Sequence, residues 1–174
     1  MVHSVKDYFT VTIVFTIASA IAYACSLGGL SYNGFPVIVY CMLISFLVHW
    51  MAFIPSYALR TEKYYDICGT LAYLCVLLTA LYLTTSASEN SLHTRSILAI
   101  ILVLTWALRL GFFLFIRVLK AGEDRRFREV KQKFSGFLVW WTISALWVFL
   151  TTVNALVMII NNVPYQNDYY FYFG

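Results

Sequence analysis

Residues 36–58 read PVIVYCMLISFLVHWMAFIPSYA, and this stretch decides the fold class. It contains no Asp, Glu, Lys or Arg, and about 20 mainly apolar residues are enough to cross a hydrocarbon core of roughly 30 Å. Pro36 suits the first position of a helix, and Pro55 is expected to kink or end that helix. The stretch therefore predicts a transmembrane helix.

Four more apolar runs of similar length occur in the chain, at residues 8–30, 67–84, 96–118 and 137–160. Only helices and closed barrels satisfy their backbone polar groups in lipid, and none of the runs alternates as a barrel strand does. The first run is longer than the apolar segment of 7–15 residues in a signal peptide, so we expect it to be a span. The sequence predicts an all-α integral membrane bundle of about five transmembrane helices.

The composition agrees with this fold class. Of 174 residues, 61% are hydrophobic and only 11% are charged, whereas soluble domains carry about 25% charged residues. We expect one transmembrane domain over residues 1–160. Residues 161–174 form a tail rich in Tyr and Phe, which favour the headgroup layer of a membrane.

The charges predict an orientation. With five spans, the N-terminus, the link near residue 60 and the loop at 120–134 lie on one side. Of the lysines and arginines, the opposite side holds only Arg95. By the positive-inside rule, the N-terminus and the basic loops face the cytoplasm or matrix, and the C-terminus lies on the other side. The basic side holds Lys6, Arg60, Lys63, Lys120, Arg125, Arg126, Arg128, Lys131 and Lys133, with Arg117 at its border.

Metal and nucleic-acid sites are not indicated. Cys25, Cys41, Cys68 and Cys75 all fall inside apolar runs, without the spacing of a zinc site. We expect them to pack between helices as small apolar side chains. The basic loop lies too close to the membrane to suggest a nucleic-acid partner.

Arg109 is the most informative single residue, because it lies within the fourth span. A charge at that depth costs several kcal/mol unless it is paired, hydrated or able to reach the surface. Two interpretations remain open. Arg109 holds an anionic group between helices, or its side chain extends towards the basic surface, where Arg117 follows about two turns later.

Two polar segments at the membrane boundary are further candidates. The loop at 122–128, with Arg125, Arg126 and Arg128, either binds phosphate-bearing ligands and lipid headgroups or is a solvated connector with internal ion pairs. In the segment at 62–66, carboxylates and phenols either exchange protons or have structural roles. In the structural interpretation the tyrosines are interfacial anchors and Asp66 is a helix N-cap.

These residues occur in an order that resembles the DUF1295 family, membrane proteins similar to steroid 5-alpha-reductases and isoprenyl-cysteine methyltransferases. The resemblance covers roughly Pro55 to Pro164. It is carried by Arg60-Thr61-Glu62-Lys63-Tyr64-Tyr65-Asp66, Gly69-Thr70-Leu71-Ala72-Tyr73, Trp106-Ala107-Leu108-Arg109-Leu110-Gly111, Arg117 and Gly122-Glu123-Asp124-Arg125. The matching motif residues that we single out are Glu62, Tyr64, Asp66, Trp106, Glu123 and Asp124.

The resemblance implies a helical domain that reduces a lipid-like double bond with NADPH. In the family, an Arg-His-Pro-Asn-Tyr type motif follows in later helices, and nothing after Pro164 resembles it. We therefore expect a non-catalytic accessory subunit of a larger membrane complex, without a cofactor and in contact with other membrane subunits and phospholipids. We place it in an energy-converting membrane such as the mitochondrial inner membrane, within the respiratory chain.

Two alternatives stay open. One is an NADPH-dependent reductase of a sterol-like or fatty substrate. The other is a lipid-binding protein that keeps the cavity without the chemistry, with lipid near Arg109 and the loop at 122–128.

Overall fold

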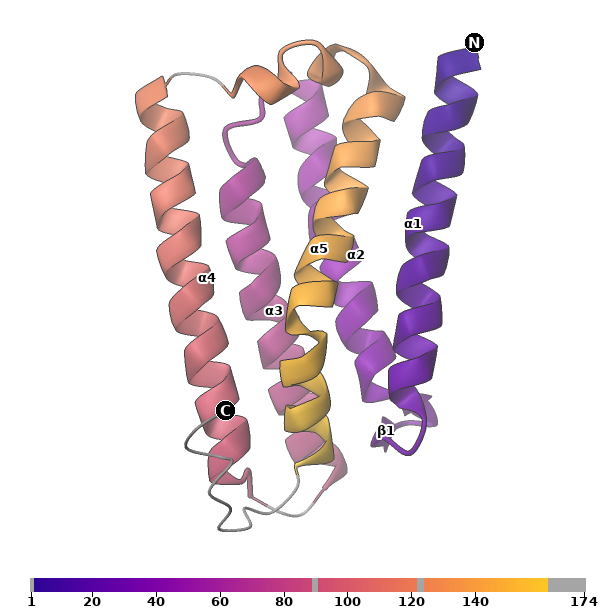
Figure 1. Ribbon diagram of the computed structural model, residues 1–174, viewed down its shortest axis with the longest axis vertical. Coiled ribbons are helices and arrows are strands. Elements are labelled where there is room, and N and C mark those ends of the chain that lie inside the picture. The colour runs from indigo at the N-terminus through magenta and orange to yellow at the C-terminus, as the bar shows by residue number, and fades with distance from the viewer. Residues whose placement is uncertain (1, 89–90, 122–123, 163–174) are drawn as a thin grey trace.

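The protein folds as a bundle of helices in this computed structural model, which describes residues 2–88, 91–121 and 124–162 (Figure 1). Five long helices account for most of it: α1 (Val2–Ser26), α2 (Val37–Ala58), α3 (Tyr65–Ala87), α4 (Thr94–Ala121) and α5 (Phe134–Asn161). All five are long and apolar enough to cross a membrane. The predicted class, an integral membrane helical bundle, is confirmed.

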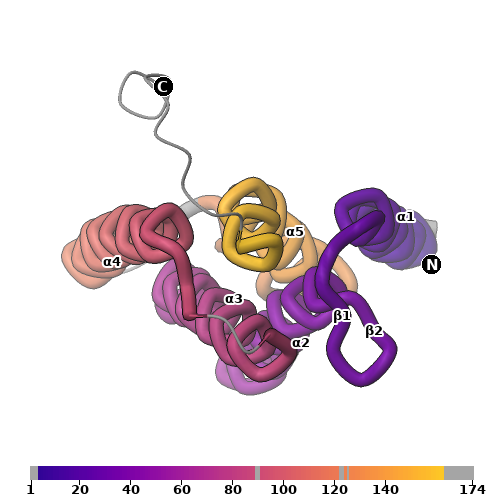
Figure 2. Tube along the Cα trace, turned by 90° about the horizontal axis from the view of Figure 1, so that it is seen from below, coloured from indigo at the N-terminus to yellow at the C-terminus, as the bar shows by residue number. Residues whose placement is uncertain are grey.

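The helices form two layers, seen end-on in Figure 2. α4, α5 and α1 lie side by side in one layer, and α3 and α2 form the other. α5 contacts each of the other four helices. It is therefore the central element of the bundle, while α1 and α4 lie at its two edges and expose most of their surfaces.

Small side chains bring the helices close together. Ala18, Ala72, Ala80 and Ala145 are fully buried at helix contacts, as expected where packing rather than water drives association. α3 and α4 are in close contact at Gly111. A Cβ atom added to Gly111 would lie 1.7 Å from Thr70 Oγ1, so only glycine fits at that crossing.

Polar side chains join α5 to its neighbours inside the apolar core. Ser45 of α2 donates a hydrogen bond of 2.8 Å to the Ala145 carbonyl, and the Trp50 indole donates to Thr142 Oγ1 at 3.1 Å. From α3, the Tyr65 hydroxyl donates to the Trp140 carbonyl at 2.9 Å. Because unpaired polar groups are costly in an apolar interior, these bonds fix the register of α5 against α2 and α3.

The connections differ in detail from the predicted boundaries. The turn expected at 31–34 is a small hairpin in which β1 (Ser31–Tyr32) pairs antiparallel with β2 (Phe35–Pro36). Asn33 and Gly34 both have positive φ, as a two-residue hairpin turn requires. Pro36 precedes the first residue of α2, and α2 continues past Pro55 to Ala58. Most of the predicted tail lies outside the described residues.

Two short 3-10 helices, η1 (Arg125–Phe127) and η2 (Val130–Gln132), connect α4 to α5. They lie at the end of the bundle that also holds the N-terminus and the link between α2 and α3 (Figure 1). This end, which we call the basic end, contains Lys6, Arg60, Lys63, Lys120, Arg126, Lys131 and Lys133. The opposite end holds the hairpin and the start of α4, where Arg95 lies.

Candidate functional site

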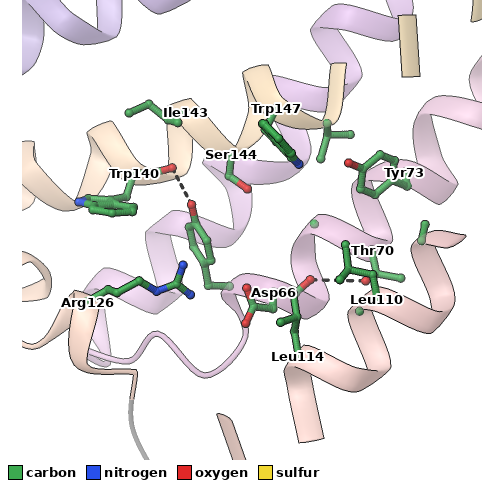
Figure 3. A pocket seen from close by; sticks show the side chains of 15 residues that line it. Asp66, Thr70, Tyr73, Leu110, Leu114, Arg126, Trp140, Ile143, Ser144 and Trp147 are labelled. Atoms are coloured by element: carbon green, nitrogen blue, oxygen red, sulfur yellow. Dashed lines mark hydrogen bonds between the residues drawn. The ribbon is translucent and has the colours of Figure 1, made fainter. Parts of the chain in front are cut away.

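A cavity of about 380 Å³ lies between α3, α4 and α5 (Figure 3). Its walls are mainly apolar, and its polar side chains are concentrated towards the basic end. Ligand pockets in proteins are usually 300–1,000 Å³ and combine apolar walls with a few placed polar groups. The side chains or backbone of Tyr65, Asp66, Gly69, Thr70, Tyr73, Ala107, Leu110, Gly111, Leu114, Arg126, Trp140, Ile143, Ser144, Trp147 and Val148 line the cavity.

Glycine and alanine make room for this cavity. Gly69 lines the α3 wall, and no heavy atom lies within 4 Å of the position that its Cβ would occupy. Ala107 and Gly111, one turn apart on α4, line the opposite wall. There is therefore free space beside Gly69 of α3, whereas Gly111 of α4 packs directly against Thr70 of α3.

At the basic end, the cavity is lined by two charged side chains, Asp66 and Arg126, and two more lie beside them. Arg117, in the last turns of α4, lies 3.9 Å from the Asp66 carboxylate and 3.8 Å from the Asp124 carboxylate. Arg126 Nε donates to both carboxylate oxygens of Asp124 at 3.0 Å. These four side chains form a charge cluster in which two guanidinium groups balance two carboxylates.

Asp124 is the best-anchored acid of this cluster. Its side chain is 11% exposed, and its carboxylate also accepts a hydrogen bond of 3.0 Å from the Arg126 backbone N–H. The hydrogen bonds from Arg126, together with the nearby charge of Arg117, hold the pKa of Asp124 below its ordinary value of 3.8. Asp124 is therefore ionised at neutral pH and keeps Arg126 at the cavity mouth.

A second ion pair holds the segment between α4 and α5, described at residues 124–133 and called the connector below, against the α2–α3 link. Glu62, only 3% exposed, accepts from Lys131 Nζ at 2.7 Å and from the Asp124 backbone N–H at 3.0 Å. Because a buried carboxylate needs partners to remain charged, this pair ties the link between α2 and α3 to both ends of the connector. Within the loop at 122–128, the ion pair between Arg126 and Asp124 agrees with the interpretation of a connector with internal ion pairs.

The cavity wall on α5 is linked to a buried histidine. Ser144 Oγ, which lines the cavity, lies 3.1 Å from His49 Nε2, and His49 Nδ1 lies 2.8 Å from the Ser45 carbonyl. A carbonyl oxygen accepts only, so Nδ1 carries the proton. Deeper in the cavity, the Tyr73 and Thr151 hydroxyls lie 2.6 Å apart.

The structure places the predicted site residues in different locations. Asp66, Arg117, Asp124 and Arg126 come together in the charge cluster, and Glu62 contacts it through the Asp124 backbone N–H. Tyr64 and Arg128 are exposed at the basic end. Glu123 lies outside the described residues, and for Arg125 only the backbone of η1 is described.

Two of our structural expectations need correction or refinement. Asp66 is not a helix N-cap, because α3 begins at Tyr65 and the N-cap is Tyr64, which makes no side-chain cap bond. Asp66 is instead one residue inside the helix, where its carboxylate faces the cavity. Arg109 is not part of the charge cluster. It is exposed on the outer face of α4, in a depression of about 420 Å³ with Trp106, Leu110 and Phe113.

The sequence did not reveal the α5 side of the cavity. Trp140, Ser144 and Trp147 lie within an almost continuous apolar run, where a serine and two tryptophans are ordinary. Their spacing of four and three residues places them on one helix face. Nothing in the run, however, distinguishes that face from the one that packs on α2. His49, like Ser45, is a buried polar residue on α2, and both indicate polar contacts within that span.

The comparisons with known proteins concern the family alone. The family model described as "Protein of unknown function (DUF1295)" matches residues 52–169. No curated protein and no solved structure matches the chain. The matched region includes α3, α4 and α5, and therefore the whole cavity with its charge cluster.

Proposed function

Since this chain belongs to the DUF1295 family, whose description assigns no activity, we propose its function from the cavity: it binds an amphipathic, lipid-like molecule within the membrane. The cavity of about 380 Å³ between α3, α4 and α5 carries this proposal. Its apolar walls suit a hydrocarbon chain or ring system, and the Asp66 end suits a polar head. The ligand enters with its head at the level of the charge cluster and its body along Tyr73 and Trp147.

A cavity-filling substitution tests this proposal. Phe in place of Gly69 extends a ring into the open space beside α3 without a clash at Cβ. Leu71→Phe is the matched control, because Leu71 is 52% exposed on the same helix and lies outside the cavity. The intact protein is released from detergent micelles into a mass spectrometer after addition of 1-dodecanol.

We expect saturable binding of 1-dodecanol to the wild type and to Leu71→Phe. Gly69→Phe should lose most of the binding while it keeps the elution volume of the folded protein. Equal binding by Gly69→Phe and the wild type would place the ligand elsewhere and would contradict the proposal.

A role as accessory subunit of a larger membrane assembly is the second candidate, and Arg109 favours it. Arg109 lies eight residues before Arg117, about 12 Å deeper along α4, and its neighbours Trp106 and Phe113 are exposed. Among the described residues, no hydrogen bond or salt bridge involves its side chain. A cation facing lipid at this depth is costly, so a partner subunit with a polar or acidic group would stabilise this face.

Copurification tests the accessory role. If the protein belongs to an assembly, the tagged chain should retain a defined set of membrane subunits on native gels. Arg109→Leu should lose them, while Lys120→Leu, at the exposed end of the same helix, should keep them. A wild-type chain that migrates alone would contradict this role.

We further propose that the basic end faces the cytoplasm or matrix and that the opposite end faces away from it, because positively charged loops are retained on that side. The mitochondrial inner membrane and a respiratory complex remain our predicted setting. Fractionation of organelles from cells that express the tagged chain tests both.

The reductase suggested by the family resemblance would use the same cavity, with its substrate on the apolar walls. It predicts saturable NADPH binding by the protein in detergent and loss of that binding when the charge cluster is altered by Arg126→Gln. Absence of NADPH binding by the wild type would remove this alternative.

A further inference from the structure

We propose that the cavity selects a neutral ligand whose polar head donates a hydrogen bond, such as an alcohol, over the corresponding ketone or carboxylate. This inference rests on the proposed ligand-binding function and names the chemistry of the head. It follows from the direction of the hydrogen bonds around Tyr65, Ser144 and Asp66, the three side chains at the polar end of the cavity.

The Tyr65 hydroxyl already donates its hydrogen bond within the protein. Its hydroxyl donates to the Trp140 backbone carbonyl at 2.9 Å, so the hydroxyl oxygen has only lone pairs left to offer. A ligand that meets this oxygen must bring its own hydrogen.

The Ser144 hydroxyl also donates its hydrogen bond within the protein, to His49. The imidazole is fully buried, and the structure gives it no carboxylate partner among the described residues, so it is neutral. Nδ1 holds the proton and donates it to the Ser45 carbonyl, which leaves Nε2 as an acceptor. Nε2 therefore accepts a hydrogen bond of 3.1 Å from the Ser144 hydroxyl. The Ser144 oxygen then presents lone pairs to the cavity.

Asp66 completes the set as a carboxylate, which only accepts. Its charge does not call for a cationic ligand, because Arg117 and Arg126 balance Asp66 and Asp124 in the cluster. The polar end is therefore rich in acceptors and close to neutral. Ser144 and Asp66 project towards the same space in Figure 3, so one hydroxyl can reach this region.

Three other cavity side chains carry N–H groups: Arg126, Trp140 and Trp147. Arg126 directs Nε and Nη2 at Asp124, which occupies two of its five N–H groups. Trp147 lies one turn beyond Ser144 along α5 and is 60% exposed, so its indole belongs to the outer, aromatic part of the cavity. The preference for a donating head therefore rests on Tyr65, Ser144 and Asp66, whose oxygens line the cavity as acceptors.

A matched pair of probes tests the inference. 1-Dodecanol and 2-dodecanone have the same chain length and differ in whether the head donates or only accepts. Binding of each to the full chain in detergent micelles is measured by mass spectrometry of the intact protein. We expect the wild type to bind the alcohol about tenfold more tightly, since an unmatched pair of acceptors loses at least one hydrogen bond.

Asp66→Asn should reduce this preference, because the amide introduces N–H donors for the ketone. Asp7→Asn is the control at the same end of the bundle, where Asp7 accepts from Ser135 at 2.6 Å, and it should keep the full preference. If Asp66→Asn does not fold, Ser144→Ala replaces it. That variant should weaken alcohol binding and leave ketone binding unchanged.

The outcomes separate the two proposals. Equal binding of alcohol and ketone by the wild type, with Gly69→Phe still blocking both, overturns the donor preference and leaves the ligand-binding function standing. Failure of both probes to bind the wild type contradicts the proposed function itself.

Discussion

At the residue scale, Glu62 shows how a polar group holds the polar connector in place. It is buried, yet it joins the α2–α3 link to the Asp124 backbone and to Lys131. Removing one member of a buried pair leaves the other without compensation, which usually costs about 3–5 kcal/mol when burial is complete. Lys131 is 16% exposed on its side chain, so water offsets part of this cost.

Glu62→Gln should therefore destabilise the protein by about 1–3 kcal/mol. The amide keeps the shape of the carboxylate and removes its charge from Lys131. Thermal unfolding in detergent measures the effect, and Glu129→Gln, an exposed carboxylate in the same connector, should change little. Equal effects of both substitutions would contradict the role assigned to Glu62.

Asp124 makes the stability of the folded protein depend on pH in the acidic range. Its pKa in the folded protein lies below the ordinary value of 3.8, so the unfolded chain binds its proton first as the pH falls. The stabilisation is complete above pH 4 and is lost as the pH falls through the folded-state pKa. Asp124→Asn should lose the part of the acid-induced decrease that Asp124 causes, measured as the unfolding temperature between pH 7 and pH 2.5.

At this scale, sequence reasoning singled out charged residues that the structure brings together, and it gave no sign of the α5 wall of the cavity. Asp66, Arg117 and Asp124 stand out because charges are rare in this chain. Ser144 and Trp147 lie among residues of similar polarity, and only the rotation of α5 against α3 makes them part of the cavity wall. That rotation depends on long-range packing, which no local pattern records.

At the element scale, the contact between α3 and α4 depends on two glycines with opposite surroundings. Gly111 is pressed against Thr70, whereas the space beside Gly69 is open. Helix existence was predictable here from the long apolar runs alone. The crossing point was not, because Gly111 looks like any other glycine within a span.

The two glycines should respond oppositely to alanine. Gly111→Ala forces Thr70 or the whole of α4 to move, and we expect a loss of about 1–3 kcal/mol, as for other overpacked sites. Gly69→Ala adds a methyl group in open space and should stabilise helix α3 by up to about 1 kcal/mol. Unfolding temperatures of the two variants, measured side by side in the same detergent, give the comparison, and a stabilising Gly111→Ala would refute the close contact.

At the scale of the whole molecule, the lysines and arginines divide the bundle into a basic end and an end where, among the described residues, only Arg95 carries such a charge. The five helices bring the start of α1, the connector and the α2–α3 link to the same end (Figure 1). This separation was predictable, because it needs only the number of spans and the positions of the charges. The layer order was not, since the five runs have similar hydropathy and fit several packings.

The orientation can be measured with single cysteines. In a background without the four native cysteines, Glu129→Cys at the basic end should react with a membrane-impermeant maleimide from the cytoplasmic or matrix side. Asn33→Cys, in the hairpin at the other end, should react only from the opposite side. Labelling of both positions from one side would contradict the five-span topology.

The central position of α5 has a consequence for how the protein is made. A ribosome inserts α1 to α4 before α5 emerges, yet α5 supplies the hydrogen-bond partners of Ser45, Trp50, Tyr65 and Tyr73. Until then these groups face lipid or one another without their final partners. We therefore expect the first four helices to stay loosely packed until α5 arrives, which completes the bundle and forms the cavity between α3, α4 and α5 in the same step.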